Sequence, residues 1–560
     1  IVYVRGESSR DISMLLRLYP NLADAHFLKA EILYSQNYFD DALTATELAK
    51  KNFLLGYYHK RPYIEVLEQI YLFDIVDLEI KIRLGEVENN KVEINKDDII
   101  ELTTEKCIST AKCLYITYSE LAMDVKSGDR ILIDDGKIEQ LSTGRNRGAG
   151  IRVIAGDTTG FAHTADLSEA GLMAAARVAA EAARQGGGGT KVIALTTQPS
   201  RIVSPIKIDP STIGKAAKVD LLRRVDDAAR SAGGAISQVS AGYSDGRTRI
   251  VIANSDGLVA HDERVRTLLR VSAVANGDAG MQTGFDSLGH TMGFELFDKV
   301  QVEDVARAAA GRALTKLKAR PAPSGSLPVV IKAGSGGVLF HEACGHGLEA
   351  DLVAKGASVY KGKVGELVAS PLVTLVDDGT MTHEWGAIAI DDEGHPSQYN
   401  VLIENGILTD YMWDYLRARN EGRPQSGNGR RQSYKDLPMV RMTNTYVLNG
   451  EEDPADIIKD TPNGVYVAHL GGGSVNTATG DFVFGMTEAY LIENGEITEP
   501  LREGNLIGNG PQVLKDIDLM GNDFAMGGPG TCGKDGQGVP VGDGCPTLRV
   551  KSMTIGGTAA

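Results

Sequence analysis

The chain has 560 residues, 42% of them hydrophobic, and 74 acidic against 58 basic residues give a formal net charge of −16. So acidic a chain is not expected to bind nucleic acid, and no apolar run approaches the ~18 residues of a membrane span. Five cysteines are too few for a disulfide framework, so a reducing, cytoplasmic location is predicted.

Residues 1–129 are predicted to form a segment unlike the rest of the chain, since only five of the 65 glycines fall within the first 140 residues. Residues 20–49 carry apolar residues at helical spacing on both sides of a polar turn, which predicts a helical hairpin resembling one tetratricopeptide repeat. Residues 114–138 then predict mixed strands. One repeat cannot bury its own apolar face, so an ordinary helical hairpin is the alternative.

Residues 130–322 are predicted to form a two-layer α/β unit. Apolar residues at helical spacing predict three helices, over 168–184, 213–232 and 302–317. Alternating residues predict strands over 249–253 and 264–274, with Asn254–Gly257 as a turn between them. The Pro-, Gly- and Ser-rich segment Arg320–Ser326 predicts a linker.

Residues 327–560 are predicted to form a β-rich domain in which a helix begins near Val338. The predicted strands cover 327–331, 372–376, 386–390, 399–404, 464–469, 481–485 and 489–493. Asn405-Gly406 and Asn494-Gly495 each predict a hairpin turn. The predicted fold class is therefore α+β, with a two-layer unit followed by a β-rich domain that carries a metal-binding helix.

The predicted helix carries two histidines around a glutamate, His341, Glu342 and His346. The pattern is one residue longer than the H-E-x-x-H pattern of zinc proteases. On an α-helix the two histidines would lie about 140° apart, whereas a π-helical turn of about 4.4 residues brings them within about 50°. Gly345 and Gly347, poor α-helix formers, lie where that distortion is needed. The spacing thus predicts a metal site on a π-helical turn, the alternative being a polar helix with two unrelated histidines.

A third ligand is expected from outside the helix. Cys532 lies in the glycine-rich segment 526–540, which is predicted to be a loop able to fold tightly around an ion. A thiolate suits Zn²⁺. Cys344 and Cys545 have the same chemistry and remain alternatives.

Three segments together resemble a known family. They are His341–Asp351, Gly471–Phe484 and Met526–Pro540. On these segments residues 130–560 resemble the TldD branch of the TldD/PmbA metalloprotease family, whereas residues 1–130 do not match it.

The resemblance implies that His341, His346 and Cys532 hold Zn²⁺ and that Glu342 is the general base. It also implies a partner, a TldE (PmbA)-like subunit that lacks these metal ligands, so this chain resembles the catalytic subunit; a homodimer is the alternative.

The predicted function is that of a zinc-dependent peptidase acting on unfolded or short peptides with a metal-activated water. Gly471, Gly472 and Gly473, with Asn476, are expected to bind an extended substrate by β-augmentation; a bulge or hairpin loop is the alternative for the glycines. A non-catalytic, zinc-stabilised protein that binds peptides or a partner is the alternative function. Glu342 favours the enzyme, because a structural zinc site has four protein ligands and does not need it.

Overall fold

The computed structural model describes residues 101–103, 113–115, 129–134, 136–156, 158–184, 196–198, 203–278 and 280–557. The chain divides into two compact units, Ile1–Val125 and Lys126–Ala560. The described residues of the first unit form two short parallel strands, β1 (Glu101–Thr103) and β2 (Cys113–Tyr115). The helical hairpin predicted at 20–49 lies outside the described residues.

The second unit opens with an antiparallel sheet in the order β10-β9-β8-β3-β4, to which β7 adds a short parallel pairing. Its strands are β3 (Asp129–Asp134), β4 (Lys137–Thr143), β7 (Thr196–Thr197), β8 (Ile236–Ala253), β9 (Leu258–Gly277) and β10 (Gly280–His290). The turn predicted between β8 and β9 is confirmed, with Asn254 Oδ1 accepting from the backbone N–H groups of Asp256 and Leu258.

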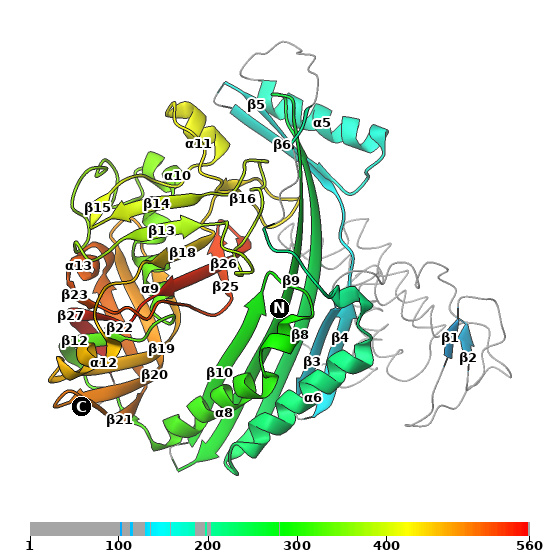
Figure 1. Cartoon of the computed structure of the whole chain (residues 1–560). Helices are drawn as coiled ribbons and strands as arrows, with labels where there is room; N and C mark the ends of the chain where they lie inside the picture. The colour runs from blue at the N-terminus through cyan, green and yellow to red at the C-terminus, as the bar shows by residue number, and fades with distance from the viewer. Residues whose placement is uncertain are drawn as a thin grey trace, which may run out of the picture. The chain divides into compact units, whose positions relative to one another are not determined.

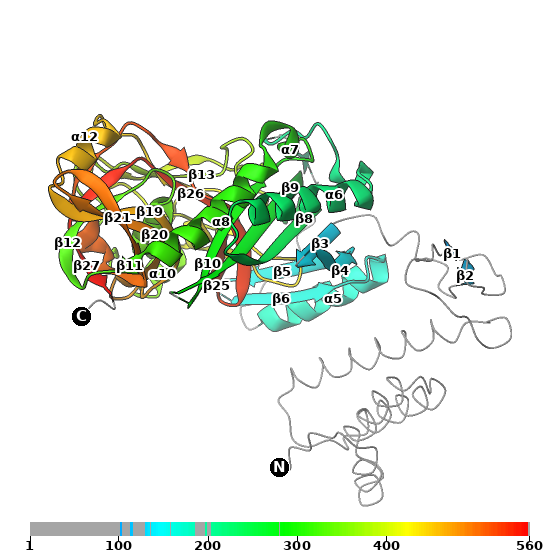
Figure 2. The same cartoon turned by 90° about the horizontal axis from the view of Figure 1, so that it is seen from below.

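Two helices, α6 (Lys215–Ser231) and α8 (Val302–Lys318), cover one face of this sheet (Figures 1 and 2). Side chains alternate between the faces of a strand, so Val239, Ala241 and Tyr243 of β8 pack in the core beneath the helices. Ser240, Gly242 and Ser244 consequently belong to the opposite face. Both helices were predicted, and their observed ends lie within two residues of the predicted ones.

A smaller α/β layer precedes these helices in the chain. The hairpin β5 (Ala149–Ala155) and β6 (Thr158–Thr164) packs against α5 (Glu169–Ala183), which confirms the predicted helix. The side chain of Ser168 caps the start of α5 by accepting from the N–H of Gly171. Any side chain at Gly160 would overlap the carbonyl oxygen of Ala179, so a glycine allows β6 to approach the helix closely.

Two further sheets form the β-rich part of the unit. The first has the order β11-β21-β20-β19-β12-β27-β22, with β23 beside β27, and the second has the order β15-β14-β13-β18-β26-β24, with β25 beside β26. The strands of the first sheet are β11 (Arg320–Pro321), β12 (Gly325–Ile331), β19 (Asn463–Val475), β20 (Asp481–Glu493), β21 (Glu496–Arg502), β22 (Gly504–Asn509), β23 (Ile517–Met520) and β27 (Leu548–Gly556). The strands of the second are β13 (Leu375–Asp378), β14 (Tyr399–Glu404), β15 (Ile407–Leu408), β18 (Asn444–Val447), β24 (Ala525–Met526), β25 (Gly530–Lys534) and β26 (Gln537–Cys545).

Short helices and one short strand pair complete the second unit. They are α7 (Leu296–Lys299), α9 (Gly337–Phe340), α10 (Ala350–Ala354), α11 (Tyr415–Asn420), α12 (Pro454–Lys459), α13 (Gly510–Lys515) and the pair β16 (Gly429–Arg430) and β17 (Met439–Val440). The α+β fold class, with a β-rich part carrying the helix that starts near Val338, is confirmed. Among the described residues, no helix combines the length and the apolar character needed to cross a membrane.

The predicted hairpins are also observed. Asn405-Gly406 joins β14 to β15 and Asn494-Gly495 joins β20 to β21. All four residues have positive φ angles, between 49° and 83°, which is the conformation a type I′ turn requires.

Three predicted details are wrong. Residues 481–485 and 489–493 belong to one strand, β20. The predicted linker contains β11, which pairs with β21, and the start of β12. Residues 386–390 form no ladder strand, because their hydrogen bonds go to scattered partners. Arg264 donates to the carbonyl of Ile390 and Asn444 accepts from the N–H of Gly386, while the N–H groups of Ala387 and Ile388 donate to the carbonyls of Glu384 and Gly379.

Candidate metal centre

Both histidines of the predicted motif lie on a segment that passes through three helix types. α9 leads into a π-helical turn, His341–Gly345, which a 3₁₀ turn, His346–Leu348, follows. The backbone N–H of His346 donates to the carbonyl of His341, and this i to i−5 bond defines a π-helix. The predicted π-helical turn is therefore confirmed, and the two imidazole centroids lie 5.0 Å apart.

The two glycines of the motif have a second role besides permitting the distortion. A side chain at Gly345 would collide with Sδ of Met442, and a Cβ at Gly347 would lie 2.7 Å from the ring of Tyr360. Both glycines therefore allow the histidine-bearing segment to pack directly against the surrounding core. Spacing within the motif could not reveal these contacts.

Cys532 lies in a different element from the one predicted. The segment expected to be a glycine-rich loop contains a β-hairpin, in which Cys532 of β25 pairs with Val539 of β26. Asp535-Gly536, with φ angles of 49° and 76°, forms its turn, and Asp-Gly is a strong hairpin sequence that the prediction overlooked. Arg441 donates to the carbonyls of Cys532 and Gln537, so a buried guanidinium supports the hairpin backbone.

The structure brings His341, His346 and Cys532 together. All three are buried, and one ligand atom from each lies within 4.8 Å of the others; Sγ of Cys532 is 3.5 Å from Nε2 of His346. Burial alone would raise the pKa of the Cys532 thiol, but hydrogen bonds and positive charge from the two histidines outweigh it and lower that pKa to about 5. The thiolate, which is the form that binds metals, is therefore favoured.

The other two candidate cysteines are in different surroundings. Burial raises the pKa of Cys344 to about 12, and Cys545 also has a raised pKa because it is buried. The Cys344 thiol donates to the carbonyl of Phe340 instead of pointing to a ligand cluster. Of the three cysteines, only Cys532 lies in the cluster of potential metal ligands found among the described residues.

These residues fit a metal ion by their chemistry. Two imidazoles and a thiolate are borderline and soft donors of the kind that zinc prefers. Nδ1 of His341 is buried without a hydrogen-bond partner among the described residues. Glu342 lies beside the cluster, with Oε2 3.9 Å from Nε2 of His346. A three-ligand cluster with an adjacent free carboxylate matches the composition of a catalytic metal site.

A buried ion-pair network orients His346. Oε2 of Glu349 lies 3.1 Å from Nδ1 of His346 and accepts from Nζ of Lys534 at 3.0 Å. Lys534 also donates to Asp351 at 2.7 Å, so it connects the β25 strand of Cys532 to the end of the histidine segment. Burial would raise the pKa of Glu349, but the charges of His346 and Lys534 lower it. Lys534 was not predicted, because only the fold brings it to the motif.

We expect Glu349→Gln to lower metal affinity by about 10- to 100-fold, the usual effect of losing a carboxylate behind a ligand histidine. The amide keeps the volume of the side chain but carries no charge to stabilise the orientation of His346. Titration of the purified variant with a competing chelator measures the change. The exposed Glu366→Gln is the matched control, and unchanged affinity in Glu349→Gln would mean that Glu349 does not position the ligand.

The site contains a second carboxyl group that was not predicted. Burial raises the pKa of Asp543 to about 7, while the charge of His341 opposes that rise and the charge of Glu342 adds to it. Asp543 lies on β26, one strand away from Cys532. Its position follows from strand pairing, so the sequence offered no indication of it.

The residues predicted to bind substrate lie at the C-terminal end of β19. This strand contacts the π-helical turn. β19 pairs with β12 only over Val465–Val467, and its register with β20 shifts between Leu470 and Gly473. The three glycines therefore lie at a bulge, and Gly472 has no atom within 4 Å of its Cβ position. Asn476 lies just after β19, where its Oδ1 accepts from Ala478 N–H in the turn to β20.

Family models match most of the second unit. The PmbA/TldA metallopeptidase domain 1 matches residues 120–183, the central domain residues 208–317 and the C-terminal domain residues 324–557. The chain is 40% identical over 454 residues to a metalloprotease TldD homolog of Haemophilus influenzae, a match that covers 79% of this chain and 93% of the relative. The chain thus belongs to the TldD branch of the PmbA/TldA metallopeptidase family and is a metalloprotease.

Two other comparisons bear on the site and the fold. A zinc metalloprotease TldD homolog of Saccharolobus solfataricus is 31% identical over 306 residues, covering 54% of this chain and 68% of the relative. The crystal structure of TldE from Thermococcus kodakarensis superposes with a TM-score of 0.61 at 22% identity, covering 77% of this chain and 95% of that chain. The similarity to the TldE structure shows that the two chains share a fold.

Proposed function

We propose that this metalloprotease is a zinc-dependent peptidase that cleaves unfolded or short peptides and is the catalytic subunit of a TldD/TldE-type complex. The observation that carries the proposal is the cluster of His341, His346 and Cys532 beside a carboxylate, Glu342, that is not needed as a ligand. The S. solfataricus relative named a zinc metalloprotease supports the choice of metal. When bound, zinc supplies Lewis-acid polarisation of the peptide carbonyl and lowers the pKa of a water molecule.

The chain's own residues provide proton transfer, orientation of a ligand histidine and peptide binding. Glu342 accepts a proton from the attacking water at its carboxylate and passes it to the leaving amine. Glu349 holds His346 through Nδ1, which leaves Nε2 facing Cys532. The edge of β19 at Gly471–Gly473, with Asn476 beyond it, offers backbone groups to an extended peptide. Backbone pairing favours unfolded peptides over folded proteins and requires little of their sequence.

The test combines metal analysis with peptide digestion, using the full chain alone and mixed with a TldE-like subunit. We expect one zinc per chain, cleavage of an unstructured peptide, and loss of cleavage on chelation that added zinc reverses. The same peptide sequence placed inside a stably folded domain should resist cleavage. Stoichiometric zinc without cleavage, alone or with the second subunit, would support a zinc-stabilised binding protein instead.

A further inference from the structure

The sheet face opposite α6 and α8 contains a pocket of about 340 Å³. Its floor is formed by Gly242 of β8, which lies between Leu132 of β3 and Arg270 of β9 in the strand register. Because Gly242 has no side chain, the sheet surface is recessed at this point. A Cβ there would meet Leu132 at 3.7 Å, an ordinary contact distance, so the recess is open space rather than a tightly packed glycine.

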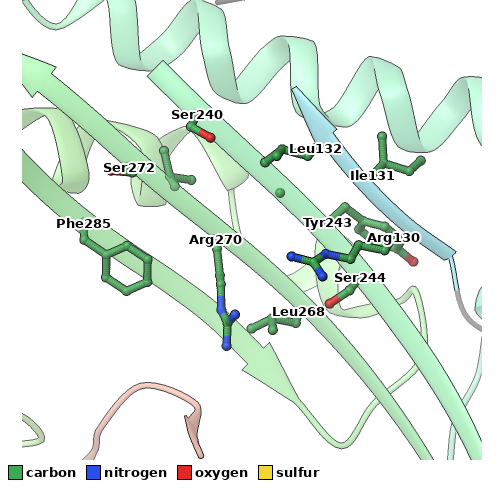
Figure 3. Close-up of a pocket in the computed structure, with 12 residues that line it drawn as sticks. Arg130, Ile131, Leu132, Ser240, Tyr243, Ser244, Leu268, Arg270, Ser272 and Phe285 are labelled. Carbon is green, nitrogen blue, oxygen red and sulfur yellow. The ribbon is translucent and has the colours of Figure 1, made fainter. Parts of the chain in front are cut away.

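The polar lining of this pocket is positive. Arg130 and Arg270 extend from strands on the two sides of β8, as Figure 3 shows. Neither guanidinium has an ion-pair partner among the described residues, and the pocket lining contains no acidic residue. Ser240, Ser244 and Ser272 add hydroxyl groups. Both arginines are exposed, and two guanidinium groups on one face with no carboxylate in the lining favour a carboxylate-bearing occupant.

The same sheet face contacts the hairpin that carries Cys532. A Cβ at Gly289, on this face of β10, would overlap Leu268 of the pocket wall and Pro529, at 2.8 and 2.9 Å, so Pro529 packs directly on the face. Pro529 lies three residues before Cys532, at the start of its hairpin. The half-exposed ring of Phe285, 48% accessible, offers an apolar contact beside the arginines. The pocket therefore lies on a face that contacts the start of the Cys532 hairpin.

We infer that the Arg130–Arg270 pocket binds carboxylate groups of the peptide substrate, so that the peptidase prefers peptides with an acidic segment or a free C-terminus near the cleaved bond. The inference rests on the proposed peptidase function and adds a substrate preference to it. Arginine forms paired, charge-assisted hydrogen bonds with a carboxylate, and serine hydroxyls can donate to its remaining lone pairs.

The test measures binding of fluorescent peptides to full-length protein carrying Glu342→Gln, which prevents turnover. Three peptides share one sequence except at the central acidic or amide positions and at the C-terminus. The first has central Asp and Glu residues and an amidated C-terminus, the second has Asn and Gln with a free C-terminus, and the third has Asn and Gln with an amidated C-terminus. The first or second peptide should bind about 10-fold more tightly than the third, and whichever does so identifies the source of the carboxylate.

Arg130→Gln and Arg270→Gln should each remove this preference and leave binding of the third peptide unchanged. Gly242→Val should also remove it, because it fills the pocket without altering any charge. The control is Arg223→Gln, on the exposed surface of α6, with a side chain that is 62% accessible. Circular dichroism and thermal melting establish that each variant is folded.

The outcomes separate the inference from the proposed function. Equal binding of all three peptides, or a preference that survives Arg270→Gln and Gly242→Val, would overturn the inference even if peptides are cleaved. Variants that weaken only association with a TldE-like subunit would also overturn it and would identify this face as a subunit contact. A charge preference in a protein that cleaves no peptide would support carboxylate binding by the pocket but overturn the peptidase proposal on which the substrate preference rests.

Discussion

Replacing Glu342 with Gln is expected to reduce peptide cleavage by about 10²- to 10⁴-fold, the usual contribution of a general base. The amide occupies the same volume but cannot accept the proton of the attacking water. Zinc content should not change, because the carboxylate lies 3.9 Å from Nε2 of His346 and is additional to the three-ligand cluster. Turnover of a quenched fluorescent peptide, with metal analysis of the same preparation, measures both effects.

Exposed Glu421→Gln is the control and should leave both turnover and zinc content unchanged. Cleavage retained by Glu342→Gln would show that another group takes the proton, and Asp543 would be the next residue to replace. Zinc lost together with activity would instead make Glu342 a ligand. The first failure retains cleavage, whereas the second loses both cleavage and metal.

Replacing Cys532 with Ser should weaken zinc binding by more than the 10- to 100-fold expected for Glu349→Gln, because a first ligand is removed rather than its support. The Cys532 thiol has a pKa of about 5 in its histidine surroundings and is readily deprotonated. A serine hydroxyl stays protonated near neutral pH and is a poor zinc ligand. Chelator competition and cleavage rates should both register the loss.

Cys545→Ser is the matched control, since Cys545 is also buried but has a raised pKa. It should retain zinc, although burial of a hydroxyl costs some stability. If Cys545→Ser loses zinc and Cys532→Ser keeps it, the third ligand has been misassigned.

Local patterns were sufficient to predict the regular elements. The apolar spacing of 168–184, 213–232 and 302–317 predicted α5, α6 and α8, because amphipathic periodicity records which face is buried. Asn-Gly predicted two hairpins, because its residues tolerate the positive φ angles of the turn. Residues 386–390 were wrongly predicted as a strand, since their hydrogen bonds are divided between local backbone carbonyls and the side chains of Arg264 and Asn444, which are distant in sequence.

The site was predictable where its residues are neighbours in sequence. The five-residue step from His341 to His346 was enough to predict the π-helical turn, because helix geometry alone decides whether two side chains share a face. Lys534 and Asp543 could not be predicted in this way, because strand pairing brings them to the site: Lys534 pairs with Gln537 in the β25–β26 hairpin, and Asp543 of β26 pairs with Thr445 of β18. It also misread the hairpin of Cys532 as a loop, because glycine content was given more weight than its Asp-Gly turn.

The separation of the ligands along the chain makes metal content a reporter of folding quality. Cys532 lies 186 residues from His346, so an unfolded chain cannot hold the three donors together. Binding to the folded form alone stabilises that form, and by the same linkage any loosening of the fold lowers metal affinity. Substitutions far from the cluster that weaken the β25–β26 hairpin are therefore expected to appear first as metal deficiency, while secondary structure is still intact. We expect the ratio of metal to chain to report loss of integrity before the helix or strand content changes.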